Sequence, residues 1–221
     1  MSHIVVTHWH ADHIGGVPAI LKHLNTEQTC CVLKGKSDRD MISSTAVTDG
    51  HEIRAEGATL RLIHSPGHTD DHFAAFLVEE NALFSGDCVL GEGTAVFENL
   101  RQLLSSLQLF VDLKPSVIYP GHGPVVDNPI AKLQQYIDHR LMRERQVMDA
   151  LPETAADGLT IEGIVRKMYT DTPEKLLRAA AGNVFHHLNK LLEEGKVMSA
   201  DVDDGVVYYR VINSDFNSNV K

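Results

Sequence analysis

The sequence predicts an α/β domain with a metal site, followed by a small helical domain that ends in a β-hairpin. Three observations support this expectation. Short β-branched runs alternate with amphipathic segments through the first half of the chain. Histidines and aspartates stand directly after several of those runs. Near the C-terminus, two helical stretches precede two apolar strands joined at Asp203-Asp204-Gly205.

Composition places the chain among ordinary globular proteins. It has 221 residues, of which 43% are hydrophobic, enough for one large domain or a medium and a small one. The net charge of -10 argues against a protein that coats nucleic acid through a broad basic surface. Cys30, Cys31 and Cys88 form no disulfide framework, which favours a reducing compartment. We expect no membrane span and no targeting segment in this chain.

The first predicted domain covers residues 1–151. Its strands are marked by β-branched or alternating apolar runs that end at turn residues such as Pro66-Gly67. Its helices are marked by apolar residues three and four apart, and Asn128-Pro129 is typical of a helix start. Strands are expected at 4–7, 59–64, 73–78, 82–84 and 117–119, and helices at 14–24, 96–113 and from 129 to 151.

The second predicted domain covers residues 152–221. Pro152 and the small polar residues up to Gly158 form the best candidate boundary. Apolar spacing predicts a helix over 161–168 and another from Thr172-Pro173 to Gly195, which is typical of a helix end. The hairpin follows over 197–211. Helices followed by a hairpin indicate a winged-helix-like domain.

The stretch THWHADH, residues 7–13, crowds metal-ligand side chains into one turn. Zinc binds neutral imidazoles and carboxylates at about 2 Å. His8 and His10 are two positions apart, so an extended or tightly turned segment points both rings the same way. Asp12 and His13 follow where the chain enters a helix. One turn therefore offers two pairs of ligands to neighbouring metal positions.

Three further candidate ligands follow predicted strands: His68 in PGHT, Asp87 in SGD and His122 in PGHG. Loops at strand ends are where a scaffold brings side chains together. Five histidines and two aspartates suffice for two Zn²⁺ ions, although such sites accept other first-row divalent metals. Two ions could activate a hydroxide at neutral pH and clamp both oxygens of a displacement.

These motifs resemble a known family. THWHADHIGG, PGHTDDH, FSGDCVLGEGTAVF and YPGHGP resemble the metallo-β-lactamase superfamily, and within it the beta-lactamase-like protein 2 group of mitochondrial endoribonucleases related to glyoxalase II. The resemblance implies an αβ/βα sandwich and hydrolysis of single-stranded RNA. By resemblance, His8, His10 and His68 hold one zinc, Asp12, His13 and His122 hold the second, and Asp87 bridges both. It also implies that Asp12 is catalytic, because it sits where the family orients the attacking water.

The resemblance also carries an expectation about the first sheet. In the superfamily the HxHxDH turn follows several N-terminal strands, whereas in this chain it starts at residue 8. We therefore expect an N-terminally incomplete sheet with an exposed edge and an uncovered face, which favours self-association. The implied location is the mitochondrial matrix, with the cytoplasm as the alternative.

Two other functions stay open. The same ligands suit a thioester or lactam hydrolase of the glyoxalase II type, and an incomplete first sheet suits a non-catalytic metal-binding or interaction form. His72 either contacts substrate, supports a ligand or makes a structural hydrogen bond, and Cys88 is expected to be buried. In the second domain, one set of polar residues either faces nucleic acid or packs internally: Asn183, His186, His187, Asn189 and Lys190.

Overall fold

The computed structural model describes residues 1–26, 29–39, 42–170, 173–202 and 205–211. Contacts divide the chain into two compact units, Met1–Ile137 and Asp138–Lys221. The division falls inside helix α4 (Pro129–Ala150), earlier than the boundary predicted after residue 151. The reason is local packing, because Val147 and Ala150 on the last turns of α4 belong to the core of the second unit.

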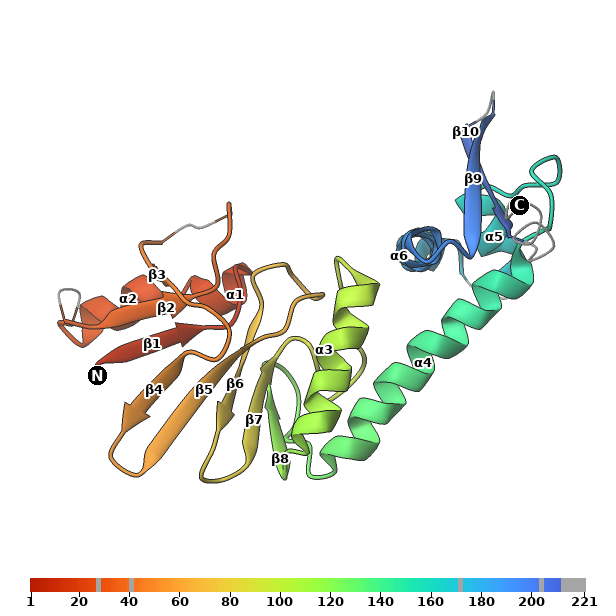
Figure 1. Cartoon of the computed structure of the whole chain (residues 1–221). Helices are drawn as coiled ribbons and strands as arrows, with labels where there is room; N and C mark the ends of the chain where they lie inside the picture. Colours follow the sequence, from red (N-terminus) through yellow and green to blue (C-terminus); the bar gives the residue numbers. More distant parts are fainter. Residues whose placement is uncertain (27–28, 40–41, 171–172, 203–204, 212–221) are drawn as a thin grey trace, which may run out of the picture. The chain divides into compact units, whose positions relative to one another are not determined.

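The first unit holds two β-sheets (Figure 1). The smaller sheet is parallel and has the order β1 (His3–Val6), β2 (Cys31–Lys34) and β3 (Thr45–Ala46). The larger sheet has the order β4 (Glu52–Ala55), β5 (Ala58–His64), β6 (Phe73–Leu77), β7 (Ala82–Gly86) and β8 (Val117–Pro120). Its strands pair antiparallel except for the parallel pair β7 and β8.

Alternation along the strands builds four layers. In β6, Phe73 and Ala75 pack with Leu33 of the smaller sheet, while Ala74 and Phe76 point to the other face of the larger sheet. There they meet α3 (Leu100–Leu113) and the start of α4. On the outer face of the smaller sheet lie α1 (Ala11–Ile14) and α2 (Val17–His23). The order helix, sheet, sheet, helix confirms the predicted αβ/βα sandwich.

Most predicted elements are present, with three differences. The helix expected over 14–24 is shorter, because α2 begins only at Val17; Ile14 is the last residue of the preceding helix α1, and Gly15-Gly16 separate the two helices. The helix expected from residue 96 begins at Leu100, because the Asn99 side chain caps it by accepting a hydrogen bond from the Gln102 N–H. The short strands β2, β3 and β4 had not been expected, since residues 25–58 carry no clear apolar period.

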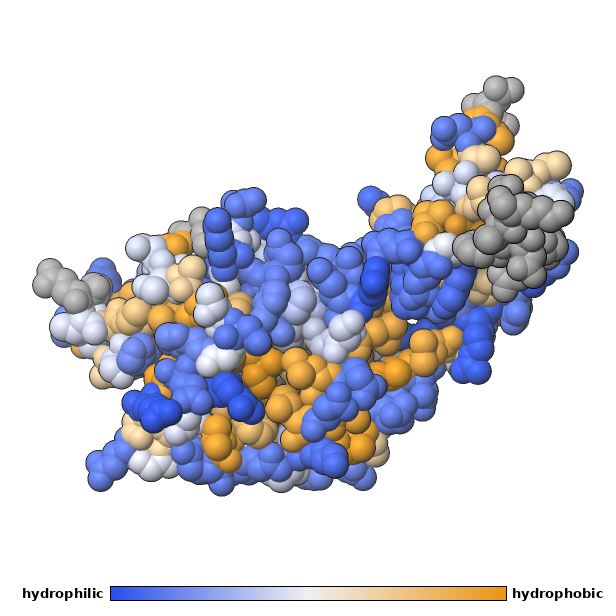
Figure 2. Space-filling view, viewed as in Figure 1, coloured by the Kyte–Doolittle hydropathy of each residue, from blue (hydrophilic) through white to orange (hydrophobic). Residues whose placement is uncertain are grey.

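Within the described residues of the first unit, two aromatic side chains on the inner face of the larger sheet are partly exposed. Phe84 pairs with Ala75 and Tyr119, so both aromatic rings lie on the face that the smaller sheet covers elsewhere. The two rings stack with centroids 5.1 Å apart, and the residues are 39% and 37% exposed. Figure 2 shows hydrophobic surface around β7 and β8. Strand β1 forms one edge of the smaller sheet. Self-association through this edge remains a prediction.

The second unit is a small helical bundle with a hairpin. After the end of α4 come α5 (Ile161–Met168) and α6 (Glu174–Glu193), then the antiparallel strands β9 (Val197–Val202) and β10 (Gly205–Arg210). Leu151, Ile164, Leu188 and Tyr208 are part of its core. Residues 203–204 of the predicted turn lie outside the described residues. In the part of the chain that is described, no helix is long and apolar enough to cross a membrane.

Candidate metal centre

The THWHADH turn leaves the end of β1 and is held from both sides. Ile14, at the end of α1, is 1% exposed and packs with Val6 of β1 and with α2. The carbonyl oxygen of Thr7 accepts a hydrogen bond of 2.8 Å from the N–H of Phe73, at the start of β6. The turn is therefore fixed against both sheets before any ligand side chain is considered.

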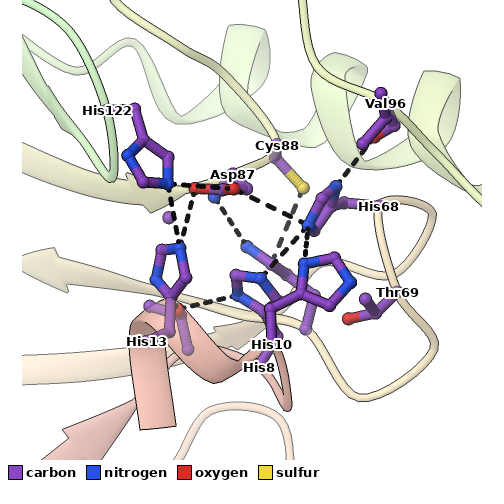
Figure 3. A network of polar contacts seen from close by, with 12 residues as sticks. His8, His10, His13, His68, Thr69, Asp87, Cys88, Val96 and His122 are labelled. Atoms are coloured by element: carbon purple, nitrogen blue, oxygen red, sulfur yellow. Dashed lines mark hydrogen bonds and ion pairs between the residues drawn. The ribbon is translucent and has the colours of Figure 1, made fainter. Parts of the chain in front are cut away.

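Three imidazoles and one carboxylate form the first ligand group, which lies deep in the site (Figure 3). Nε2 of His68 lies 3.1 Å from Nε2 of His8 and 3.1 Å from Nδ1 of His10. Oδ2 of Asp87 lies 3.7 Å from Nε2 of His68. His8 and His68 are almost fully buried.

The second ligand group consists of Asp12, His13 and His122, and it is open to solvent. Nε2 of His122 lies 3.2 Å from Nε2 of His13 and 3.2 Å from Oδ2 of Asp12. The side chain of Asp12 is 59% exposed and that of His122 is 47% exposed. One group is thus enclosed and the other is accessible, which leaves room for a substrate beside the second.

Asp87 lies between the two groups. Its Oδ1 is 3.3 Å from Nε2 of His13, and its Oδ2 is 3.5 Å from Nε2 of His122 and 3.7 Å from Nε2 of His68. Figure 3 shows its carboxylate between His122 and His13 on one side and His68 on the other. The structure therefore brings all seven predicted residues together, and the bridging role expected for Asp87 remains a prediction.

The donor atoms have spacings that suit a metal ion. Two ligand atoms about 2.1 Å from a tetrahedral ion are roughly 3.4 Å apart. The nitrogen–nitrogen contacts of 3.1 to 3.2 Å in both groups are close to this value. Unprotonated ring nitrogens that point at one another repel through their lone pairs. A cation bound between them removes this repulsion. The residues present therefore fit divalent metal ions, and their role as ligands remains a prediction.

The electrostatics favour the metal-binding forms of His8, His68 and Asp87, whereas the hydrogen bond with Asp87 raises the pKa of His13. Burial, followed by the neighbouring imidazoles, lowers the pKa of His8 to about 2, and burial also lowers the pKa of His68. Burial alone would raise the pKa of Asp87, but its contact with His13 and the nearby rings lower it to about 2. At neutral pH His8 and His68 are neutral imidazoles and Asp87 is a carboxylate, the forms required for metal binding.

The loop that carries His68 is held by three hydrogen bonds of its side chains. Nδ1 of His68 lies 2.7 Å from the carbonyl oxygen of Val96, so Nδ1–H donates there and Nε2 is left free for a ligand role. Beneath the loop, the buried Lys34 ammonium donates to Oδ2 of Asp71 at 2.7 Å, and the hydroxyl of Thr69 donates to Oδ1 at 2.7 Å. Lys34 was missed in the sequence, because one lysine in a short strand gives no sign of burial.

His72 supports the site without reaching its surface. The side chain is fully buried, its Nδ1–H donates to the Ser65 hydroxyl at 2.8 Å, and its Nε2 accepts a hydrogen bond of 3.1 Å from the Asp87 N–H. Burial lowers the pKa of His72 to about 3, which keeps Nε2 an acceptor. Of the interpretations left open for His72, support of a ligand agrees with these contacts, and substrate contact does not.

Two glycines and one cysteine allow the close packing around Asp87. A Cβ at Gly121 would lie 2.4 Å from Oδ1 of Asp87, and one at Gly86, which has φ +49°, would lie 2.5 Å from Nε2 of His72. Cys88 is buried as expected, and its thiol donates to the Ser65 carbonyl oxygen at 3.2 Å. Burial raises the pKa of this thiol to about 12, so it is not a candidate nucleophile.

In the second unit, part of the set considered for nucleic-acid contact is internal. His187 is 2% exposed and Lys190 is 8% exposed. The Lys190 ammonium pairs with Glu144 at 2.6 Å and with Glu194 at 2.8 Å. These contacts favour internal packing for that part of α6, while Asn183 stays exposed.

Comparisons with known proteins agree with this fold. Residues 2–122 match the Metallo-beta-lactamase superfamily, and residues 160–204 match the Beta-lactamase associated winged helix domain. The chain is 42% identical over 217 residues to the Beta-lactamase-like protein 2 homolog of Drosophila melanogaster, covering 94% of this chain and 74% of that protein. It is 34% identical over 215 residues to the Atrochrysone carboxyl ACP thioesterase of Aspergillus chevalieri, covering 95% and 68%.

Among solved structures, a Beta-lactamase domain protein from Burkholderia ambifaria has the same fold. The TM-score is 0.80 at 20% sequence identity, covering 95% of this chain and 74% of that one. Members of the matched superfamily are generally hydrolases, and the His/Asp cluster at the sheet ends suits a divalent metal site. The chain therefore belongs to the metallo-β-lactamase superfamily and carries the winged-helix domain associated with it.

Proposed function

We propose that this protein is a dinuclear zinc hydrolase that cleaves single-stranded RNA. The observation that carries the dinuclear part is the carboxylate of Asp87, which lies between the two ligand groups. Its Oδ2 is 3.7 Å from Nε2 of His68 in the enclosed group and 3.5 Å from Nε2 of His122 in the open group, and its Oδ1 is 3.3 Å from Nε2 of His13. Two bound ions would polarise the scissile phosphate and make the attacking water acidic near neutral pH. The RNA part rests on the resemblance of THWHADHIGG, GEGTAVF and the winged-helix region to endoribonucleases of this superfamily.

In this proposal the residues of the chain have separate tasks. His8, His10 and His68 would provide the enclosed position, and Asp12, His13 and His122 the open one, with Asp87 between them. Asp12 has an exposed carboxylate whose Oδ2 lies 3.2 Å from Nε2 of His122, at the solvent side of the second group. There it can orient the attacking water and accept its proton. A mitochondrial or cytoplasmic location belongs to the same proposal.

Basic side chains for phosphate steering are available in the second unit. Arg145, Arg166 and Lys167 are exposed, whereas Arg140 is buried and Arg143 lies over the Tyr169 ring with its guanidinium carbon 5.2 Å from the centroid. The exposed three support weak electrostatic attraction of RNA within a chain whose net charge is -10.

The test has two stages. Elemental analysis of protein purified without chelator should find about two zinc ions per chain. The zinc-loaded protein should then cleave an unstructured, end-labelled RNA, and chelator should stop the reaction. His10→Ala should lose cleavage, while His51→Ala, at an exposed position outside the ligand groups, should retain it. Intact RNA after incubation with fully loaded protein would contradict the proposal. Binding of well under one ion per chain would favour a non-catalytic form.

Thioester hydrolysis is the second candidate, because one relative is named as an acyl carrier protein thioesterase. The same ligand groups would activate the same water, which would attack an acyl carbon and not phosphorus. The two candidates are separated by comparing kcat/KM for an acyl thioester and for RNA with one zinc-loaded preparation. A value for the thioester that exceeds the value for RNA would make thioester hydrolysis the first candidate.

A further inference from the structure

The hydroxyl of Thr7 lies between the two ligand groups. Its Oγ1 is 3.0 Å from Nδ1 of His8, in the enclosed group, and 3.4 Å from Nδ1 of His13, in the open group. The two rings lie side by side, with centroids 4.1 Å apart. The hydroxyl oxygen of Thr7 is thus close to one ring of each ligand group. It faces the Nδ1 atoms of these rings, opposite the Nε2 atoms that face the other ligands.

The Nε2 atoms of both rings are directed into the groups. Nε2 of His8 faces His68 at 3.1 Å, and Nε2 of His13 faces His122 at 3.2 Å. A neutral imidazole carries its proton on one nitrogen only, so a proton held at Nδ1 leaves Nε2 free as a ligand. A hydroxyl oxygen has two lone pairs and can accept a hydrogen bond from both Nδ1–H groups. Thr7 can therefore select the metal-binding tautomer of both rings.

The backbone fixes the position of this hydroxyl. The Thr7 carbonyl oxygen accepts a hydrogen bond of 2.8 Å from the Phe73 N–H. On the other side, Gly86 lies so close that a Cβ placed on it would be 3.1 Å from Cβ of Thr7. The side chain is thus confined between β6 and the end of β7, and the hydroxyl stays near the two rings.

We propose that Thr7 is a positioning residue that sets the metal affinity of both ligand groups through its single hydroxyl. The inference rests on the proposed function in one respect, which is that both groups hold ions. It predicts that loss of the hydroxyl weakens two metal positions at once. The separations of 3.0 and 3.4 Å further predict a larger effect on the enclosed position.

The test measures zinc affinity by competition with a chromophoric chelator. Thr7→Val removes the hydroxyl and keeps the shape, and Thr7→Ser keeps the hydroxyl. Thr48→Val, at an exposed position outside both ligand groups, controls for the loss of a threonine hydroxyl. Thr7→Ala is a second hydroxyl-free variant for use if Thr7→Val does not fold. The Thr7 variants are measured in two backgrounds. His10→Ala weakens binding at the enclosed position, so zinc affinity in that background reports mainly on the open position. His122→Ala weakens binding at the open position, so that background reports mainly on the enclosed one.

We expect Thr7→Val to lower zinc affinity about 10-fold or more in both backgrounds, as is typical when a group that orients a ligand is removed. Thr7→Ser should stay within about 3-fold of the parent in each background, well inside that range. An unchanged affinity, a loss in one background only, or an equal loss in Thr7→Ser would each overturn the proposal. Failure of the parent protein to bind two ions would instead count against the proposed function, so the two failures are distinguishable.

Discussion

Replacement of Lys34 by methionine should strongly destabilise the first unit. The Lys34 ammonium and the Asp71 carboxylate are completely buried and lie 2.7 Å apart. At an effective dielectric constant of about 20, unit charges at this distance attract by about 6 kcal/mol. Desolvation offsets part of this attraction, and removal of one partner from a buried pair costs about 3–5 kcal/mol. Methionine has an unbranched side chain of similar length without the charge. The buried Asp71 carboxylate then keeps its hydrogen bond from the Thr69 hydroxyl but loses the one from the ammonium.

The assay is urea unfolding of the metal-free protein followed by tryptophan fluorescence. Trp9 is the single tryptophan of the chain and lies between His8 and His10, so its emission reports on the first unit. The free energy of unfolding should fall by about 3–5 kcal/mol in Lys34→Met. The double variant Lys34→Met/Asp71→Asn should recover much of the loss, because no uncompensated charge remains. A loss below about 1 kcal/mol, the range of exposed pairs, would refute the reasoning.

Three further predictions concern other parts of the molecule. Gly121→Ala should lower metal content and hydrolysis together, since its Cβ would lie 2.4 Å from Oδ1 of Asp87; an unchanged metal content would contradict the close packing. Burial lowers the pKa of His187 to about 3, so the unfolded state takes up a proton that the folded state does not between about pH 6.5 and 3. Stability should therefore fall with decreasing pH by up to about 1.4 kcal/mol per unit from this group, and His187→Leu should flatten that slope in unfolding curves measured across this range. Replacement of Phe84 and Tyr119 by serine should reduce self-association in sedimentation experiments; equal association of variant and parent would place the contact elsewhere.

Several features of the site were predictable because they depend on residue type and chain position. His8, His10, Asp12 and His13 form a dense ligand cluster after an apolar run, and polar residues after strands meet at one end of a sheet. The continuous apolar run from Phe73 to Leu77 likewise indicates a strand that is buried on both faces. Such signals are local, so they can be recognised in the sequence without knowledge of the tertiary structure.

The unpredicted features depend on distant contacts. The burial of Lys34 is decided by Asp71, which lies 37 positions along the chain. The start of α3 at Leu100 depends on the Asn99 cap and on the use of the Val96 carbonyl oxygen by His68. Residues 25–58 contain strands of two to four residues, too short to show a period of their own.

The contacts beneath His68 have a consequence for how the site acquires its ions. Lys34 and Asp71 hold the loop through a charge pair that involves no ligand atom, and the Val96 carbonyl oxygen orients the ring. Much of the entropy cost of ordering the ligands is therefore met when the chain folds and not when a metal arrives. Capture and release of an ion then require little rearrangement of the backbone, so ions should exchange without unfolding of the domain. This behaviour contrasts with that of small zinc domains, in which the metal itself drives folding.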